Sequence, residues 1–150
     1  MSSWNAVILT AGLGERIASG LKEDGGYYPK SLLMINGESI LHRQIRLLKT
    51  KEIHDITIVV SAHPLYSKLT EEIKRNVEDD IRILEISFPF EKVEKCWTLF
   101  HSKDYFRDHT IILLGDVIFD EETLDEIFSE PFEDILFLSL IHISEPTRPY

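Results

Sequence analysis

Residues 6–16 read Ala-Val-Ile-Leu-Thr-Ala-Gly-Leu-Gly-Glu-Arg, an apolar run that ends in a glycine-rich stretch. The length and the β-branched residues of this run predict a buried parallel strand over residues 6–10, which then enters a loop. Glycines at such a junction let backbone N–H groups approach a phosphate, because no Cβ obstructs them. Taken alone, two glycines after a strand are more typical of a simple tight turn, so they do not identify a phosphate-binding loop by themselves.

Strands and helices alternate along the rest of the chain. Apolar runs rich in β-branched residues predict strands at 56–60, 81–86 and 110–114, with another beginning at 135–137. Apolar residues at helical spacing predict helices at 39–49, 64–77, 93–105 and 121–129. This alternation predicts an α/β fold, a three-layer αβα Rossmann-like sheet that is mostly parallel and covered by helices on both faces.

Local signals indicate where several of these elements begin. Ser39 is a predicted N-cap, and Asp120 is another, before an acidic first turn. The pair Asn36-Gly37 predicts a tight turn. The helix over 39–49 has an apolar face formed by Ile40, Leu41, Ile45, Leu47 and Leu48.

A carboxylate follows the predicted strand at 110–114. Ligands of parallel α/β sheets bind at the carboxyl ends of the strands, where both the glycine-rich loop and Asp116 are expected. A hard divalent cation prefers oxygen ligands and bridges phosphates, so an Asp at a strand end is chemically suited to such an ion. A strand-end Asp by itself is more often a turn former or a helix cap.

Two familiar phosphate motifs are excluded. The dinucleotide-binding fingerprint requires a third small residue where this chain has Ile17, and no acidic residue follows Ser61 to hold a ribose. The Walker pattern requires Gly-Lys followed by Ser or Thr, which this chain lacks.

The composition limits the partners. The 150 residues carry a net charge of −10, which argues against a general nucleic-acid or anionic-membrane surface. No apolar run is long enough to span a bilayer, and the N-terminus lacks the features of a signal peptide. A single cysteine, Cys96, cannot form an internal disulfide, so a cytoplasmic location is expected.

Residues 9–16, together with Pro29-Lys30 and the later Gly37, resemble the signature of the NTP-transferase superfamily with a GT-A-like fold. This superfamily includes sugar-1-phosphate nucleotidylyltransferases and bacterial phosphocholine cytidylyltransferases. Its usual pattern is Leu-Ala-Ala-Gly-x-Gly-x-Arg, so Thr10 is a mild departure. The resemblance implies a nucleotidyltransferase, which transfers NMP from an NTP to a sugar phosphate or phosphorylated alcohol and releases pyrophosphate.

The resemblance also implies roles for individual residues. Arg16 and Lys30 would be catalytic, and Asp116 would bind Mg²⁺. The nucleotide would be bound by Thr10, Ala11, Gly12, Leu13, Gly14, Ser61 and Ala62. Trp97-Thr98-Leu99 is similar to a segment of cytidylyltransferases, which favours CTP, but Glu94-Lys95 replace the usual Asn residues and leave base and acceptor open.

Two other function classes stay open at this point. A non-catalytic nucleotide- or sugar-phosphate-binding regulatory module would keep the fold and lose the charges, whereas this chain retains Arg16, Lys30 and Asp116. A GT-A glycosyltransferase usually has Asp-x-Asp at the metal strand, whereas Val117-Ile118 follow Asp116 here.

Residues 138–148 read Leu-Ser-Leu-Ile-His-Ile-Ser-Glu-Pro-Thr-Arg and resemble the translated sequence of a transposase-type sequencing adapter. We therefore expect residues 1–137 to be the nucleotide-binding part of a nucleotidyltransferase domain and residues 138–150 to be non-native. The alternative is a natural strand followed by a proline-containing tail. Because the superfamily supplies a second metal-binding Asp and most of the acceptor pocket later in the chain, the fragment alone is expected to be inactive or unstable.

Overall fold

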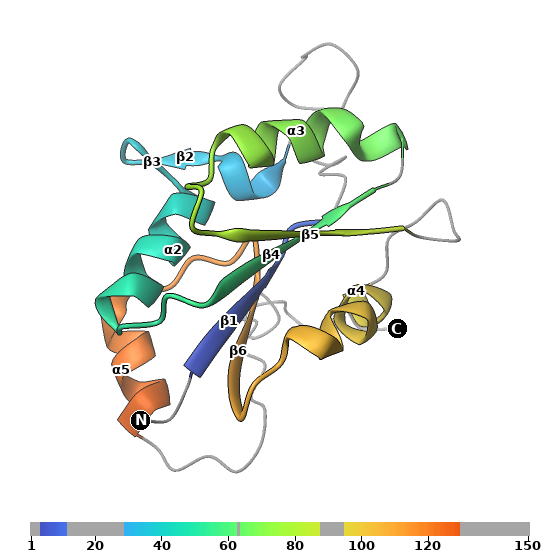
Figure 1. The fold of residues 1–150 in the computed structure, drawn as a ribbon. Coiled ribbons are helices and arrows are strands. Elements are labelled where there is room, and N and C mark those ends of the chain that lie inside the picture. Colours follow the sequence, from blue (N-terminus) through green and yellow to red (C-terminus); the bar gives the residue numbers. More distant parts are fainter. Residues whose placement is uncertain (1–3, 12–28, 63, 88–94, 130–150) are drawn as a thin grey trace, which may run out of the picture.

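The computed structural model describes residues 4–11, 29–62, 64–87 and 95–129. A four-stranded sheet in the order β5-β4-β1-β6 forms the centre of this part (Figure 1). Its strands are β1 (Trp4–Leu9), β4 (Ile56–Ser61), β5 (Arg82–Ile86) and β6 (His109–Leu114). Each neighbouring pair in this sheet is parallel, as the alternation of strands and helices predicted.

The strand order reverses at β1. The chain passes from β1 to β4 and then to β5 on one side, whereas β6 adds to the other side of β1. In open parallel sheets, ligands bind at the carboxyl ends of the strands where the order reverses in this way. The pair β1 and β6 therefore marks the edge at which a site is expected.

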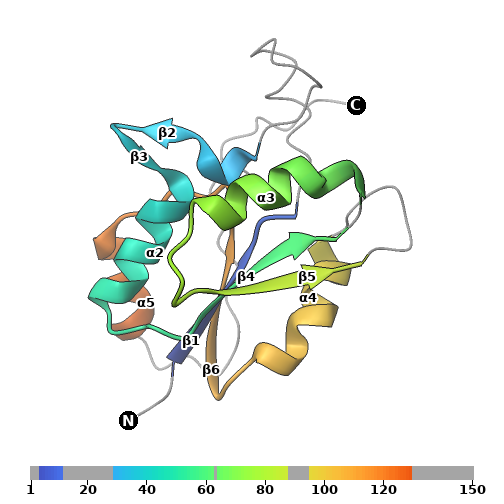
Figure 2. The same cartoon turned by 45° about the horizontal axis from the view of Figure 1, so that its top comes forward.

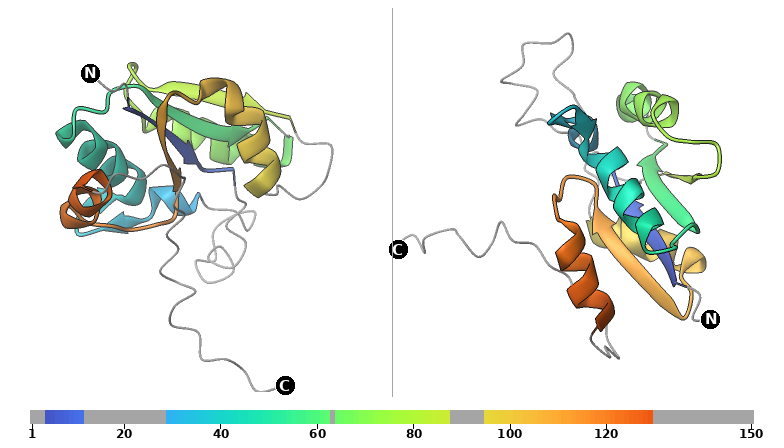
Figure 3. Two further views of the ribbon diagram at one scale, coloured as in Figure 1. Left: turned by 90° about the horizontal axis from the view of Figure 1, so that it is seen from below. Right: turned by 90° about the vertical axis from the view of Figure 1, so that its left-hand side faces the viewer.

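Helices cover both faces of the sheet (Figure 3). The helices α2 (Ile40–Thr50) and α3 (Ser67–Arg75) lie on one face and α4 (Lys95–Ser102) on the other, while α5 (Glu121–Ser129) lies beside α2. Side chains alternate along β1: Ala6 and Ile8 belong to one core cluster, and Val7 and Leu9 to the other. The three-layer Rossmann-like prediction is confirmed.

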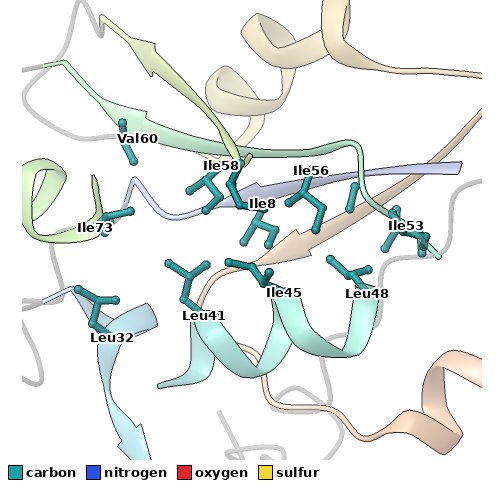
Figure 4. Close-up of a cluster of buried hydrophobic side chains, with 13 residues drawn as sticks. Ile8, Leu32, Leu41, Ile45, Leu48, Ile53, Ile56, Ile58, Val60 and Ile73 are labelled. Atoms are coloured by element: carbon teal, nitrogen blue, oxygen red, sulfur yellow. The ribbon is translucent and has the colours of Figure 1, made fainter. Parts of the chain in front are cut away.

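The larger core lies between α2, α3 and the sheet (Figure 4). Leu41, Leu48 and Ile8 are fully buried in it, and full burial of such a side chain contributes about 1.5–3 kcal/mol. All five apolar residues predicted for the face of α2 are buried, with Ile40, Ile45 and Leu47 also at 4% exposure or less. On the opposite face the partly buried Trp97 packs against the second cluster.

The start of α2 follows the local signals. Ser39 Oγ accepts a hydrogen bond from the His42 N–H at 3.2 Å, so the predicted cap is present. Before it, a hairpin pairs β2 (Met34–Ile35) with β3 (Glu38–Ser39) beside α2 (Figure 2). Asn36 and Gly37 both have positive φ, at 51° and 83°, as a two-residue type I′ turn requires.

Some boundaries differ from the prediction. The predicted helix at 64–77 divides into a 3-10 turn (Pro64–Tyr66) and α3, which ends at Arg75. The predicted helix at 93–105 continues after α4 as a 3-10 turn (Lys103–Tyr105). Such tight turns are common at helix ends, and the apolar spacing does not distinguish them from α-helix. Residues 93–94 and the strand predicted at 135–137 lie outside the described residues.

The described helices are too short or too polar to cross a membrane.

Asp120 caps α5, as predicted, through hydrogen bonds that its carboxylate accepts. The Thr123 N–H donates to Asp120 Oδ1 at 2.9 Å and the Thr123 hydroxyl donates at 2.7 Å, and these bonds lower the pKa of Asp120. A lowered carboxyl pKa stabilises the fold above the unfolded-state pKa, and the stabilisation is lost as the pH falls through the folded-state pKa. We expect thermal melts in acid to fall less steeply for Asp120→Asn, which keeps the acceptor but cannot titrate. Identical pH profiles for the variant and the parent would contradict this.

Candidate functional site at the ends of β1 and β6

The carboxyl ends of β1 and β6 are joined directly. Leu9 is the register partner of Leu114, and the Gly115 N–H donates to Leu9 O at 2.9 Å, which extends the pairing past β6. The next residues along the chain, Thr10 and Asp116, therefore leave the sheet at one edge.

Lys30 reaches this edge from a short helical turn. The 3-10 turn η1 (Lys30–Leu32) begins after Pro29, whose carbonyl accepts from the Leu32 N–H at 2.9 Å. Ser31 and Leu32 are buried, and Leu32 belongs to the main core, as Figure 4 shows. Because the turn is anchored by these two side chains, the partly exposed Lys30 has a defined starting point.

Lys30 and Asp116, which the family resemblance implied for the site, lie close together. Lys30 Nζ is 3.8 Å from Asp116 Oδ2, and the two side chains are 25% and 42% exposed. Exposed ion pairs contribute at most about 1 kcal/mol to stability. The pair therefore adds little to the fold, and both groups remain accessible to a ligand.

Thr10 is held against β4 by both its backbone and its side chain. The Thr10 N–H and the Thr10 hydroxyl both donate to Val59 O, at 3.0 and 2.9 Å. The residue that departs from the superfamily pattern thus fastens the end of β1 to the neighbouring strand. Ala11, which follows it, is buried at 6% exposure.

Gly115 has no room for a side chain. A Cβ at this position would lie 2.8 Å from Thr10 Cγ2, 3.2 Å from Leu9 O and 3.3 Å from Ser31 Cβ. We expect Gly115→Ala to lower the free energy of unfolding by about 1–3 kcal/mol in a urea titration, because the residues at the end of β1 and in η1 must move away from the added methyl group.

The closest of these contacts can be removed separately. Thr10→Ser deletes the methyl group but not the Leu9 carbonyl, so adding it to Gly115→Ala should restore part of the loss. Additive effects of the two substitutions would show that the clash is absent.

Ser61 and Ala62 lie at the carboxyl end of β4, beside β1. Ser61 is buried, and its carbonyl accepts from the Thr70 hydroxyl at 2.8 Å. Ala62 is exposed, and its N–H donates to Ile86 O at 2.9 Å. Their assignment to the base pocket stays a prediction. Gly12, Leu13, Gly14 and Arg16 lie outside the described residues, so their roles stay predictions as well.

Gln44 is a residue of this edge that the sequence did not reveal. Its side chain, 1% exposed, extends from α2 and donates to the carbonyls of Leu114 and Val117, on either side of Gly115-Asp116. A signal existed: position 44 lies between Leu41 and Leu48 on the apolar face of the predicted helix, where a polar residue is unexpected.

Asp116 can serve as one ligand of a metal ion. Among the described residues no group of three or more His, Cys, Asp or Glu side chains could enclose a metal. Mg²⁺ does not need such a cage, since it keeps several waters and uses one or two carboxylates together with substrate phosphates. An accessible carboxylate at this edge fits that mode of binding.

Comparison with known proteins agrees with this geometry. Residues 6–136 match the family model described as the MobA-like NTP transferase domain. The chain belongs to this family. No curated protein sequence matches the chain significantly.

Solved structures share the fold of this NTP transferase domain. The inositol-1-phosphate CTP transferase from T. maritima superposes with a TM-score of 0.62 at 21% identity, over 85% of this chain and 49% of that one. CTP:phosphocholine cytidylyltransferase from Streptococcus pneumoniae gives 0.51 at 24% identity, over 76% and 45%. HddC from Yersinia pseudotuberculosis, complexed with GMP-PN, gives 0.55 at 19% identity, over 85% and 54%. The NTP transferase domain described here thus spans about half the length of these proteins.

Proposed function

We propose that this chain supplies the nucleotide-binding half of a nucleotidyltransferase that moves NMP from an NTP to a phosphorylated acceptor. The observation that carries the proposal is the 3.8 Å approach of Lys30 and Asp116 at the edge where the strand order reverses. A cation for phosphate and a carboxylate for a metal are what this reaction requires, and both side chains are accessible. Membership of the NTP transferase family supports the same reaction class.

The reaction is an in-line attack. An oxygen of the acceptor phosphate forms a bond to the α-phosphorus of the NTP, the bond from that phosphorus to the bridging oxygen breaks, and pyrophosphate leaves. The attacking phosphate is already ionised at neutral pH, so no general base is required. Catalysis then depends on positioning the reactants and neutralising charge.

Each proposed residue contributes to one of these tasks. Lys30 stabilises the charge that develops at the α-phosphate, and Arg16 binds the oxygens of the leaving phosphates. The backbone N–H groups of Leu13 and Gly14 add donors to the same phosphates. Asp116 would hold Mg²⁺, which supplies positive charge at the phosphates when bound.

CTP is the proposed nucleotide, and the proposed acceptor is a phosphorylated sugar or alcohol. The similarity of Trp97-Thr98-Leu99 to cytidylyltransferases supports this choice, and two of the structural relatives are named for CTP. The acceptor pocket and a second metal-binding Asp are proposed to lie in the half of the relatives that this chain does not span.

The test is the fate of the phosphates. A protein extended through the acceptor half is incubated with Mg²⁺, each NTP labelled at the α-phosphate, and a panel of phosphorylated sugars and alcohols. We expect labelled NMP to appear on an acceptor together with pyrophosphate, and the 150-residue chain to bind the nucleotide without turnover. Transfer of an intact sugar with release of a nucleoside diphosphate would instead indicate a glycosyltransferase. Nucleotide binding by the extended protein without turnover would indicate a regulatory module.

A further inference from the structure

We propose that Gln44 is a positioning residue, which fixes the turn that carries Asp116 and so sets this carboxylate opposite Lys30. The inference deepens the proposed function and rests on it for the role of Asp116. The placement of the turn by Gln44 can be tested without that role.

The turn is defined by its backbone hydrogen bonds. The Val117 N–H donates to Leu114 O at 3.1 Å, which closes a β-turn with Gly115 and Asp116 at its centre. The Gly115 N–H is already bound to Leu9 O. The direction in which Asp116 leaves the sheet therefore depends on how the two ends of this turn are held.

Gln44 holds both ends. Its Nε2 donates to Leu114 O at 2.9 Å and to Val117 O at 2.7 Å, one proton for each carbonyl. Further along the same loop, the Phe119 carbonyl accepts a hydrogen bond from Arg43 Nε of α2 at 3.2 Å. Two neighbouring residues of α2 thus fasten the segment on both sides of Ile118.

The amide of Gln44 is buried on the apolar face of α2. An amide on the apolar face of a helix is unfavourable unless its hydrogen-bonding groups are satisfied. In the described part of the chain the Oε1 atom of Gln44 is buried and accepts no hydrogen bond. The hydrogen bonds that offset the burial of this amide are its two donated ones, and both act on the turn that carries Asp116.

The rest of α2 provides a rigid base. Leu41 and Leu48 lie one turn before and one turn after Gln44, and both are fully buried in the main core cluster. The same core cluster includes Leu32, which anchors the turn of Lys30. The helix α2 therefore helps to position both charges. Its core residues pack with Leu32, which anchors the turn of Lys30, and its Gln44 holds the turn of Asp116.

The test compares two buried amides. Gln44→Met keeps the length of the side chain and removes the donors. Asn5→Leu is the matched control, because Asn5 is also fully buried and its Nδ2 donates to a backbone carbonyl, that of Tyr105, at 2.6 Å near the amino end of β1. Both variants should lose global stability, but only Gln44→Met should speed exchange of the Val117 amide hydrogen, by about 10-fold beyond the global effect, as measured by NMR.

A second measurement follows the metal. Mn²⁺, alone and with CTP, should broaden the Asp116 amide signal in the parent chain, and Gln44→Met should weaken the apparent Mn²⁺ affinity by about 10-fold while Asn5→Leu does not. If the parent shows no broadening at Asp116, the metal role in the proposed function is wrong, and amide exchange still decides the role of Gln44.

The inference is overturned if Val117 exchanges equally in both variants. Should Gln44→Met fail to fold, the parent itself decides: the side-chain amide protons of Gln44 must exchange slowly with solvent, and rapid exchange would show that they do not hold the two carbonyls.

Discussion

Asp116→Asn is expected to reduce NMP transfer by about 100-fold or more in a protein that includes the acceptor half. The substitution preserves the shape of the side chain and removes the charge that would attract Mg²⁺ to the phosphates. The Mg²⁺ concentration needed for half-maximal turnover should rise at the same time. Stability should change little, because the partly exposed pair of Asp116 and Lys30 contributes at most about 1 kcal/mol.

A second carboxylate separates the role of Asp116 from a general effect of charge. Asp125 lies on α5 and pairs with Lys51 at 2.6 Å. Asp125→Asn removes the same charge from an exposed ion pair and should leave turnover unchanged. The metal role fails if Asp116→Asn turns over like Asp125→Asn, with the same Mg²⁺ dependence. Lys30→Ala provides a complementary test, and normal turnover in that variant would show that Lys30 has no catalytic role.

Leu41→Ala is expected to cost about 2–5 kcal/mol of unfolding free energy, because Leu41 is fully buried between α2 and the sheet. Domains of this size are stable by only about 5–15 kcal/mol, so a large share of the stability would be lost. Urea denaturation followed by circular dichroism gives the value. The cavity would also loosen the shared core that holds Leu32, so the signals of Lys30 should shift in NMR spectra.

Met34→Ala is the control for loss of a large apolar side chain. Met34 is 63% exposed in the β2–β3 hairpin, so its truncation should change stability by less than about 0.5 kcal/mol. A comparable loss in both variants would mean that the face of α2 is not the packed core.

The sequence predicted those features that depend on neighbouring residues. The N-caps Ser39 and Asp120 and the turn at Asn36-Gly37 are local, since side chain and backbone lie within three residues of one another. The layered parallel fold followed from the alternation of apolar strands and amphipathic helices. The approach of Lys30 and Asp116 followed from a general property of parallel sheets combined with the family resemblance.

Other features that depend on tertiary contacts were not predicted. The sequence did not show that β1 is central or that β6 adds to its far side, because several strand orders satisfy the same alternation. It also did not show that Gln44 spans Leu114 and Val117, since those partners are about 70 residues away. The lack of room for a side chain at Gly115 depends on the distant Thr10 methyl group in the same way.

The central place of β1 has a consequence for the order of folding. Ala6 pairs with Ile56 on one side and with Ile111 on the other, so each pairing closes a long stretch of chain. Such long-range contacts slow folding, because a long loop must be closed before they can form. β4 is synthesised before β6. Until β6 has left the ribosome, β1 can pair with β4 on one side, but its pairing partner on the other side has not yet been made. During this interval the backbone N–H and C=O groups on the β6 side of β1 are open to mispairing with another strand.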